Sequence, residues 1–331
     1  MSYPQQDCSY PQRETTPNAR IRFMPWDKLS LGNTPSILQA VLVTTLWSSS
    51  WVLIKMGLGT LPAFTFAGLR YTLAFLLLLP LMMRGDRRRE LRKLSIPQFG
   101  LLALLGIVYY TLTQGALFLG LDYLPANTLS LVLSLSGITI AFSGRLLLGE
   151  HFSWLQWIGV FVSLAGALLY FGTIGAFSAP GLFVALFALL ANTASAILGR
   201  FVNKDAELSA LLVTTVSMGI GAICLLLIGL VTETFPAFQP RDVLIIFWLA
   251  GVNTAFTFTL WNHTLRTLTA AESGVINNTM LIQIAVLAWI FLGEKLDGAQ
   301  IAGLAVAAAG TVLVHTASRR VVEAQAVPEE S

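Results

Sequence analysis

Long runs of apolar residues, separated by short segments rich in polar residues, glycine and proline, dominate the chain from residue 37 onward. A helix needs about 20 mainly apolar residues to cross the roughly 30 Å hydrocarbon core of a bilayer. These runs do not alternate apolar with polar residues, so they do not predict barrel strands, and a helix satisfies its own backbone in lipid. The sequence therefore predicts an all-α integral membrane protein with ten transmembrane helices, at 37–57, 62–83, 98–119, 125–144, 154–172, 180–199, 208–231, 242–262, 270–291 and 298–317.

A tripeptide recurs at matching places in the two halves of the chain. Leu148-Gly149-Glu150 returns 144 residues later as Leu292-Gly293-Glu294, each time after the fourth predicted helix of its half. The same offset relates Gly159 and Gly166 to Gly303 and Gly310 without a gap. With five helices in each copy, the second copy must be inverted relative to the first, because an odd number of spans reverses the starting side. The sequence thus predicts two inverted five-helix repeats.

The repeat and the flanking polar segments define the expected domain boundaries. Residues 1–35 are polar and rich in proline, which is typical of a disordered tail, and the first helix serves as its own insertion signal. The first repeat is expected at 36–173, the second at 174–317, and a short cytoplasmic tail at 318–331.

Charge is scarce and unevenly placed. Only 11% of the residues are charged, against about 25% in an ordinary soluble domain. Lys and Arg gather in alternate loops, most densely at 84–93, whereas the opposite loops hold only Arg241 and Lys295. The positive-inside rule therefore predicts a multi-pass protein of the plasma (inner) membrane with both termini in the cytoplasm. Because these charges lie beside spans and no recognised module accompanies them, no nucleic acid is expected as a partner.

Patterns that would indicate an enzyme do not occur in the sequence. His151, His263 and His315 are scattered without metal-ligand spacing, and no Gly-x-x-x-x-Gly-Lys-Ser/Thr loop is present to hold nucleotide phosphates. Cys8 and Cys224 lie in different environments, so no disulfide is expected between them. We therefore expect no enzymatic activity, no metal and no cofactor.

Four short segments, together with the Leu-Gly-Glu repeat, carry a family resemblance. They are Trp47 to Lys55, Arg70 with Ala74, Gln114 to Leu117, and Trp261-Asn262. With ten predicted helices in two halves, the chain resembles the EamA-type members of the drug/metabolite transporter superfamily over residues 36–317. The resemblance implies a transporter that works by alternating access and exports amino acids, related metabolites or amphiphilic toxic compounds. Uptake or facilitated diffusion of sugar-like or nucleotide-derived solutes remains an alternative, as does a receptor or scaffold that transports nothing.

The chain departs from the family pattern at two positions. Family members often carry a proline about thirteen residues before each motif glutamate, where this chain has Gly137 and Leu281. Gly137 permits a bend and Leu281 offers none. Glu150 and Glu294 are expected to start a helix or hold a loop, since a carboxylate is favourable at a helix N-terminus; proton coupling is the alternative.

Polar residues inside the predicted helices are the candidates for a substrate site, because polarity in lipid usually faces a partner or a water-filled cavity. Ser134 and Asn278 are related by the 144-residue offset and lie near the middle of the fourth and ninth helices, the depth at which inverted-repeat carriers bind substrate. Trp47 and Asn253 are further candidates. The predicted substrate-binding residues are Ser48, Trp51, Lys55, Arg70, Gln114, Ser134, Asn192, Trp261, Asn262 and Asn278.

Two alternatives stay open for these residues. The small and polar ones either line a cavity or join helix to helix, which membrane proteins do routinely. Lys55 is close to the outer end of its helix and either snorkels there or faces the site. Arg70 lies about eight residues into its span, where it either binds backbone carbonyls or attracts a substrate carboxylate. A small-molecule substrate and the lipid bilayer are the expected partners, and self-association is left open.

Overall fold

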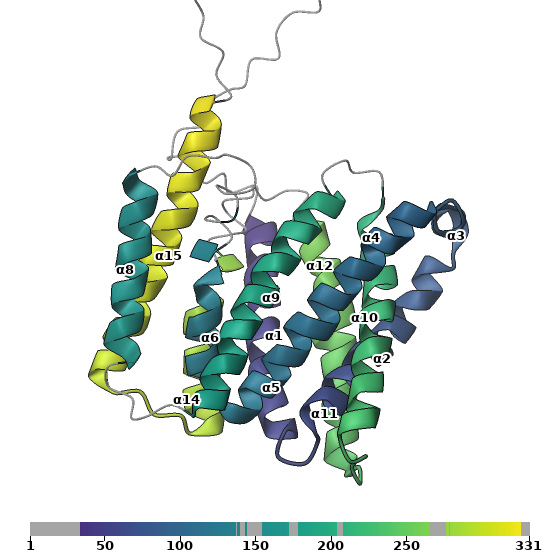
Figure 1. Ribbon diagram of the computed structural model, residues 1–331, viewed down its shortest axis with the longest axis horizontal. Helices are drawn as coiled ribbons and strands as arrows, with labels where there is room; N and C mark the ends of the chain where they lie inside the picture. The colour runs from purple at the N-terminus through teal and green to yellow at the C-terminus, as the bar shows by residue number, and fades with distance from the viewer. Residues whose placement is uncertain are drawn as a thin grey trace, which may run out of the picture.

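The computed structural model describes residues 34–136, 138–139, 143, 154–171, 178–203, 208–264, 276–277 and 279–325. All secondary structure within these ranges is helical (Figure 1). The elements are α1 (Thr34–Gly57), α2 (Ala63–Met82), α3 (Gly85–Arg92), α4 (Ile96–Gly106), η2 (Ile107–Gln114), α5 (Gly115–Tyr123), α6 (Ala126–Ser134), α8 (Trp154–Phe171), α9 (Ala179–Asn203), α10 (Ala210–Thr232), α11 (Pro240–Ala250), η3 (Gly251–Phe256), α12 (Thr257–Thr264), α14 (Met280–Leu292) and α15 (Gly298–Gln325).

Five helical segments in the described ranges are long and apolar enough to cross a membrane: Pro35–Gly57, Ala63–Met82, Ile96–Tyr123, Ala179–Gly199 and Ala210–Thr232. Three shorter apolar helices accompany them, at Trp157–Tyr170, Met280–Leu292 and Gly298–Leu313. The predicted all-α class is therefore confirmed, while the count of ten spans stays a prediction. Helix α15 continues to Gln325, past the end expected at residue 317.

The third and eighth predicted helices contain a wider turn in their middle. Each runs from an α-helix through a π-helical segment into a second α-helix: α4, η2 and α5 in one case, and α11, η3 and α12 in the other. A hydroxyl reaches the carbonyl five residues earlier in each segment, from Thr113 to Val108 (2.9 Å) and from Thr254 to Leu249 (2.9 Å). Ile107 and Gly251, which begin η2 and η3, are 144 residues apart.

Breaks also occur at equivalent positions in the fourth and ninth predicted helices. Helix α6 ends at Ser134 and a turn follows at Leu135. Helix α14 begins at Met280, directly after a turn at Thr279, and 135 and 279 are again 144 apart. Leu281 itself lies within α14, as expected of a residue that offers no bend, and the break falls two residues before it. The Thr279 hydroxyl donates to the carbonyl of Ile276 (2.6 Å), so a threonine rather than a proline or glycine occupies the break.

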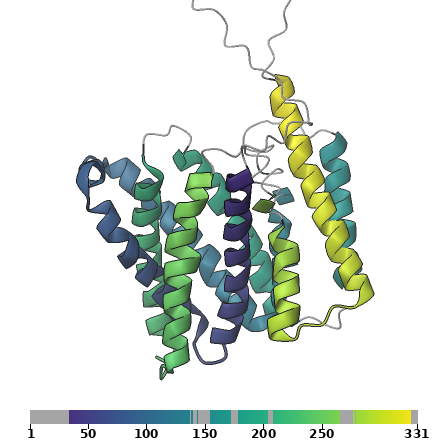
Figure 2. The ribbon, with the colours of Figure 1, turned by 180° about the vertical axis from the view of Figure 1, so that it is seen from behind.

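Helices from the two halves of the chain pack in antiparallel pairs through glycines. In the α8–α15 pair, a Cβ added to Gly166 would lie 2.7 Å from the carbonyl oxygen of Gly303, and one added to Gly303 would lie 2.7 Å from the backbone nitrogen of Tyr170. In the α2–α10 pair, a Cβ on Gly68 would lie 2.5 Å from the Cα of Leu226. Only glycine permits backbones to approach this closely. Seen from behind, α1 lies between α14 and the α11–η3–α12 segment (Figure 2).

Carboxylates from one half of the chain bind the first turns of helices in the other half. Glu233, after α10, accepts hydrogen bonds from the backbone N–H groups of Phe64 (2.9 Å) and Thr65 (2.7 Å) at the start of α2. Glu90, in α3, accepts from the backbone and hydroxyl of Ser209, the N-cap of α10. The α2–α10 pair is thus bound by a carboxylate at both ends.

Glu294 of the second Leu-Gly-Glu motif makes the same kind of contact. Its carboxylate accepts from the backbone N–H groups of Ala126 (2.8 Å) and Asn127 (3.2 Å), which begin α6. This agrees with the expectation that the motif glutamate starts a helix, because those N–H groups have no partner within the helix. Glu150 lies outside the described residues.

We expect Glu294→Ala to lower the stability of the folded protein by about 1–3 kcal/mol, because two N–H groups at the start of α6 lose a charged acceptor. The measurement is unfolding of the purified protein in mixed micelles. Lys295→Ala, at the adjacent exposed position, is the matched control and should stay within about 0.5 kcal/mol of the parent. Unchanged stability with abolished proton-dependent transport would instead assign Glu294 to coupling.

Candidate functional site

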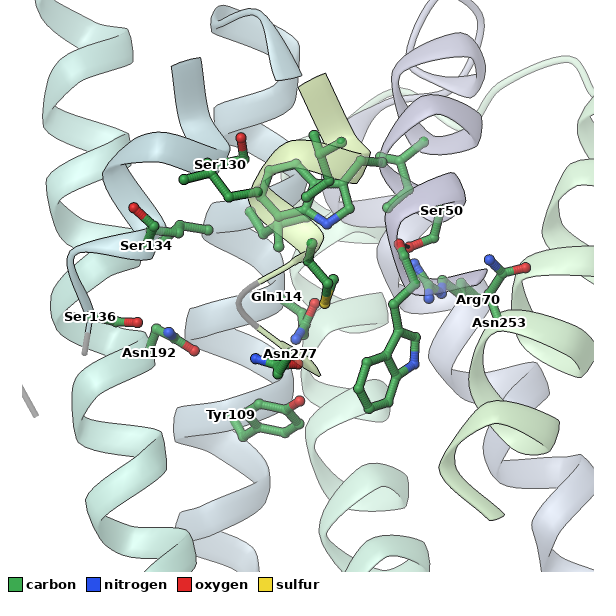
Figure 3. Close-up of a pocket in the computed structure, with 18 of the residues that line it drawn as sticks. Ser50, Arg70, Tyr109, Gln114, Ser130, Ser134, Ser136, Asn192, Asn253 and Asn277 are labelled. Carbon is green, nitrogen blue, oxygen red and sulfur yellow. Dashed lines mark hydrogen bonds between the residues drawn. The ribbon is translucent and has the colours of Figure 1, made fainter. Parts of the chain in front are cut away.

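A cavity of about 440 Å³ lies among the helices, with walls from both halves of the chain (Figure 3). Its polar lining comes from α1, α2, η2, α6, α9 and η3, and from the residues just after α6 and just before α14. The described residues that line it are Trp47, Ser50, Trp51, Ile54, Arg70, Tyr71, Tyr109, Gln114, Leu117, Ser130, Leu133, Ser134, Ser136, Asn192, Asn253, Phe258, Asn277, Met280, Leu281 and Ile284.

The two π-helical segments both supply polar side chains to the cavity wall. Tyr109 and Gln114 come from η2, and Asn253 comes from η3. Tyr109 and Asn253 are 144 residues apart in the sequence, as are Gln114 and Phe258. π-helical turns are frequent at functional sites because they redirect side chains within a helix. Here they turn equivalent positions of both halves toward one space.

Arg70 provides the cationic end of the cavity. Its side chain is 5% exposed, and its Nε donates to the hydroxyl of Thr254 on η3 at 3.2 Å. The guanidinium carbon lies 5.1 Å from the ring centre of Tyr71 and 6.0 Å from that of Phe118. In Figure 3, Arg70 lies beside Ser50 and Asn253, away from Ser134 and Asn192. No other described lining residue carries a full charge.

The opposite end of the cavity is neutral and rich in hydroxyl and amide groups. Ser130, Ser134, Ser136 and Asn192 gather there in Figure 3. The hydroxyls of Ser130 and Ser134 donate to the carbonyls of Asn127 (2.8 Å) and Leu131 (2.7 Å). A hydroxyl whose proton is already committed presents its lone pairs, so this end of the cavity offers hydrogen-bond acceptors.

Aromatic rings form another part of the cavity wall. Trp47 and Trp51 come from α1, and Phe258 from α12. The Trp47 ring centre lies 5.6 Å from that of Phe258 and 5.3 Å from that of Trp261, and its Nε1 donates to Thr257 at 3.1 Å. These contacts fix the rings in place, so they offer a preformed apolar surface.

Five of the ten predicted site residues line the cavity: Trp51, Arg70, Gln114, Ser134 and Asn192. Trp261 supports it from behind, against Trp47. Ser48 is fully buried and donates to the Oε1 of Gln283 on α14 (3.0 Å), so it joins helices instead of facing the cavity. Asn278 and the side chain of Asn262 lie outside the described residues.

Lys55 also lies apart from the cavity lining. Its Nζ donates to the carbonyls of Leu121 and, at 2.9 Å, Leu124, where α5 ends. A cation is favourable at a helix C-terminus, where carbonyls lack partners within the helix. The sequence suggested that Arg70 binds backbone carbonyls. In the structure Lys55 makes such contacts, and Arg70 lines the cavity.

Several lining residues were not predicted as site residues. Tyr71, Tyr109, Ser136, Phe258 and Asn277 are among them. The repeat could have identified two of them. The 144-residue offset relates the candidate Gln114 to Phe258, and the candidate Asn253 to Tyr109. Helical periodicity of 3.6 residues did not mark Tyr109 or Phe258, because the π-helical turns change which side chains share a face.

The family profile of the "EamA-like transporter family" matches residues 34–172 and 181–316. The chain belongs to the EamA-like transporter family. This EamA protein is 28% identical over 303 residues to the "Uncharacterized transporter YvbV" of Bacillus subtilis (strain 168), with 87% of this chain and 94% of the relative covered. It is 23% identical to the "S-adenosylmethionine/S-adenosylhomocysteine transporter" of Chlamydia trachomatis serovar L2, covering 76% and 80%.

Comparison with solved structures agrees with this assignment at the level of the fold. One crystal structure superposes with a TM-score of 0.62 at 18% identity, over 87% of the EamA protein and 98% of the other chain. The family match identifies the protein as a transporter of the EamA, drug/metabolite type, a multi-pass membrane family. The expectation that it is not an enzyme is compatible with this family and stays a prediction.

We expect cysteines placed at Ser134 and Asn192 to react with a small, water-soluble methanethiosulfonate, because both positions line the cavity. Each cysteine variant should be made in a protein in which Cys8 and Cys224 have first been replaced, so that only the introduced thiol can react. Leu131→Cys, on the same helix as Ser134 but fully buried among apolar residues, is the control and should stay unreactive. Equal labelling at all three positions would contradict a hydrated cavity.

Proposed function

We propose that this EamA protein moves a small organic metabolite across the plasma membrane by alternating access, in the direction of export. The observation that carries the proposal is the central cavity, whose lining comes from both segments that match the family. In inverted-repeat carriers, the substrate site lies where the repeats meet, near the bilayer midplane. A cavity of about 440 Å³ lies within the range of small-molecule sites.

The proposed architecture is ten transmembrane helices in two inverted repeats. Three features support it: the antiparallel α8–α15 and α2–α10 pairs, the carboxylates that bind helix starts between halves, and the π-helical segments placed 144 residues apart. In Figure 1, the start of α1, the end of α15 and the arginine-rich α3 lie at one end of the bundle. This end is the proposed cytoplasmic side.

Reporter fusions test this arrangement. We expect fusions after residues 90 and 331 to read as cytoplasmic and fusions after residues 177 and 238 to read as external, because basic residues concentrate on the first side. Fusions after residues 90 and 238 that report the same side would contradict the proposed topology.

Amino acids and related metabolites are the proposed substrates, as the family resemblance implies. The combination of a guanidinium, amides and aromatic rings suits a substrate with both a polar head and an apolar body. The chlamydial relative makes S-adenosyl compounds a reasonable part of any substrate panel. Sugar-like and nucleotide-derived solutes represent the uptake alternative.

Counterflow in proteoliposomes tests transport itself. Vesicles loaded with an unlabelled solute should accumulate the same labelled solute transiently if the protein is a carrier. We expect Ser134→Trp to abolish counterflow by filling the cavity, and Leu76→Trp, at a 52% exposed position on the outer face of α2, to retain it. Saturable binding without counterflow for every member of the panel would favour a receptor over a transporter.

A further inference from the structure

We propose that the cavity selects organic monoanions, with the substrate carboxylate on Arg70 and an aromatic or other apolar body against Trp47, Trp51 and Phe258. This inference rests on the proposed transport function, because it assigns the chemistry of the same cavity. It narrows the proposed substrates, amino acids and related metabolites, to those that carry a net charge of −1. It predicts a preference order in which a monoanion binds better than its neutral analogue, and the neutral analogue better than a cation.

The first argument is the charge of Arg70. Its side chain is 5% exposed, and within the described ranges its polar contact is the Thr254 hydroxyl, with no carboxylate in ion-pair contact. An uncompensated charge at the centre of a membrane helix costs about 2.5–3.5 kcal/mol. Arg70 is the eighth residue of α2, seven residues beyond Ala63, which is about 10 Å along the axis at 1.5 Å per residue. A charge held at this depth is compensated when an anion enters the cavity.

The second argument is the orientation of the guanidinium. Thr254 donates its own hydroxyl proton to the carbonyl of Leu249 (2.9 Å), so toward Arg70 it acts as an acceptor. This bond uses Nε and leaves the two terminal amino groups of the guanidinium, which match the two oxygens of a carboxylate. Thr254 is therefore a positioning residue. It lies in η3, and its hydrogen bond to Nε orients the guanidinium of Arg70.

The third argument is the absence of a competing charge. Lys55, the other basic residue within the spans, is bound to the carbonyls at the end of α5 and does not line the cavity. The described lining contains no Asp or Glu that would attract a substrate cation. The described part of the cavity thus carries a single positive charge, which a monoanion neutralises.

A matched set of phenylalanine derivatives tests the inference by calorimetric titration of the purified, full-length protein. N-acetylphenylalanine is a monoanion, N-acetylphenylalanine amide has the same body without charge, and phenylalanine amide is a cation. We expect the monoanion to bind at least tenfold more tightly than the neutral amide, and the cation to bind most weakly. Equal affinity for the monoanion and the neutral amide, or binding of neither, would overturn the inference.

Substitutions at Arg70 and Thr254 test whether these residues cause the preference for the monoanion. Arg70→Gln should weaken binding of the monoanion at least tenfold and change that of the neutral amide less than twofold. Arg70→Lys, which keeps the charge without the fork, should fall between. Thr254→Val leaves the arginine in place and should weaken only the anion, so it keeps the test valid if Arg70→Gln does not fold. Lys93→Gln removes an exposed charge and should alter neither affinity.

The outcomes separate this inference from the proposed function. Equal losses for anion and neutral amide in a folded Arg70→Gln protein would assign Arg70 to structure. Counterflow of other solutes by a protein that shows no preference for the anion would overturn the monoanion assignment and leave transport standing. Failure of counterflow for the whole panel would overturn the proposed function itself.

Discussion

Backbone groups at helix ends must find partners inside the bundle, and this requirement binds the two halves of the protein to each other. The first N–H groups of a helix have no intrahelical acceptor, so each needs a partner from outside its own helix. Glu233 satisfies the start of α2, Glu90 the start of α10, and Glu294 the start of α6. Each of these carboxylates comes from the other half of the chain. Neither half therefore satisfies its own helix ends alone.

Glycine contacts in the middle of the helices also join the two halves of the chain. The α8–α15 and α2–α10 pairs approach so closely that a Cβ would meet backbone atoms at Gly166, Gly303 and Gly68. In lipid, such close contact replaces the hydrophobic driving force that joins helices in water. The residues that line the cavity are a mixture of polar, aromatic and aliphatic side chains, and none of these three glycines is among them. The tightly packed pairs and the cavity are thus separate features of the bundle.

Much of this arrangement follows from sequence. The apolar runs place most helices, and the 144-residue offset identifies equivalent positions such as Ser134 and Asn278. The same reasoning found Arg70 and Gln114, because buried polarity in a membrane helix is unusual. It did not predict that Lys55 binds backbone carbonyls while Arg70 lines the cavity. The depth of a residue along its helix does not show which carbonyls of other helices lie near it. Nor did it place Ser48, whose partner Gln283 is distant in sequence. The break at Thr279 was missed because neither proline nor glycine marks it.

The π-helical turns change which side chains of the third and eighth predicted helices point in the same direction. In an α-helix, successive residues rotate by about 100°, so residues five apart point roughly 140° away from each other. A turn closed by i to i+5 hydrogen bonds brings such residues back toward one direction. Tyr109 and Gln114 consequently share the cavity, as do Asn253 and Phe258. Deleting one residue from η2 would restore the α-helical phase and rotate Gln114 out of the site while both helix ends kept their sequence.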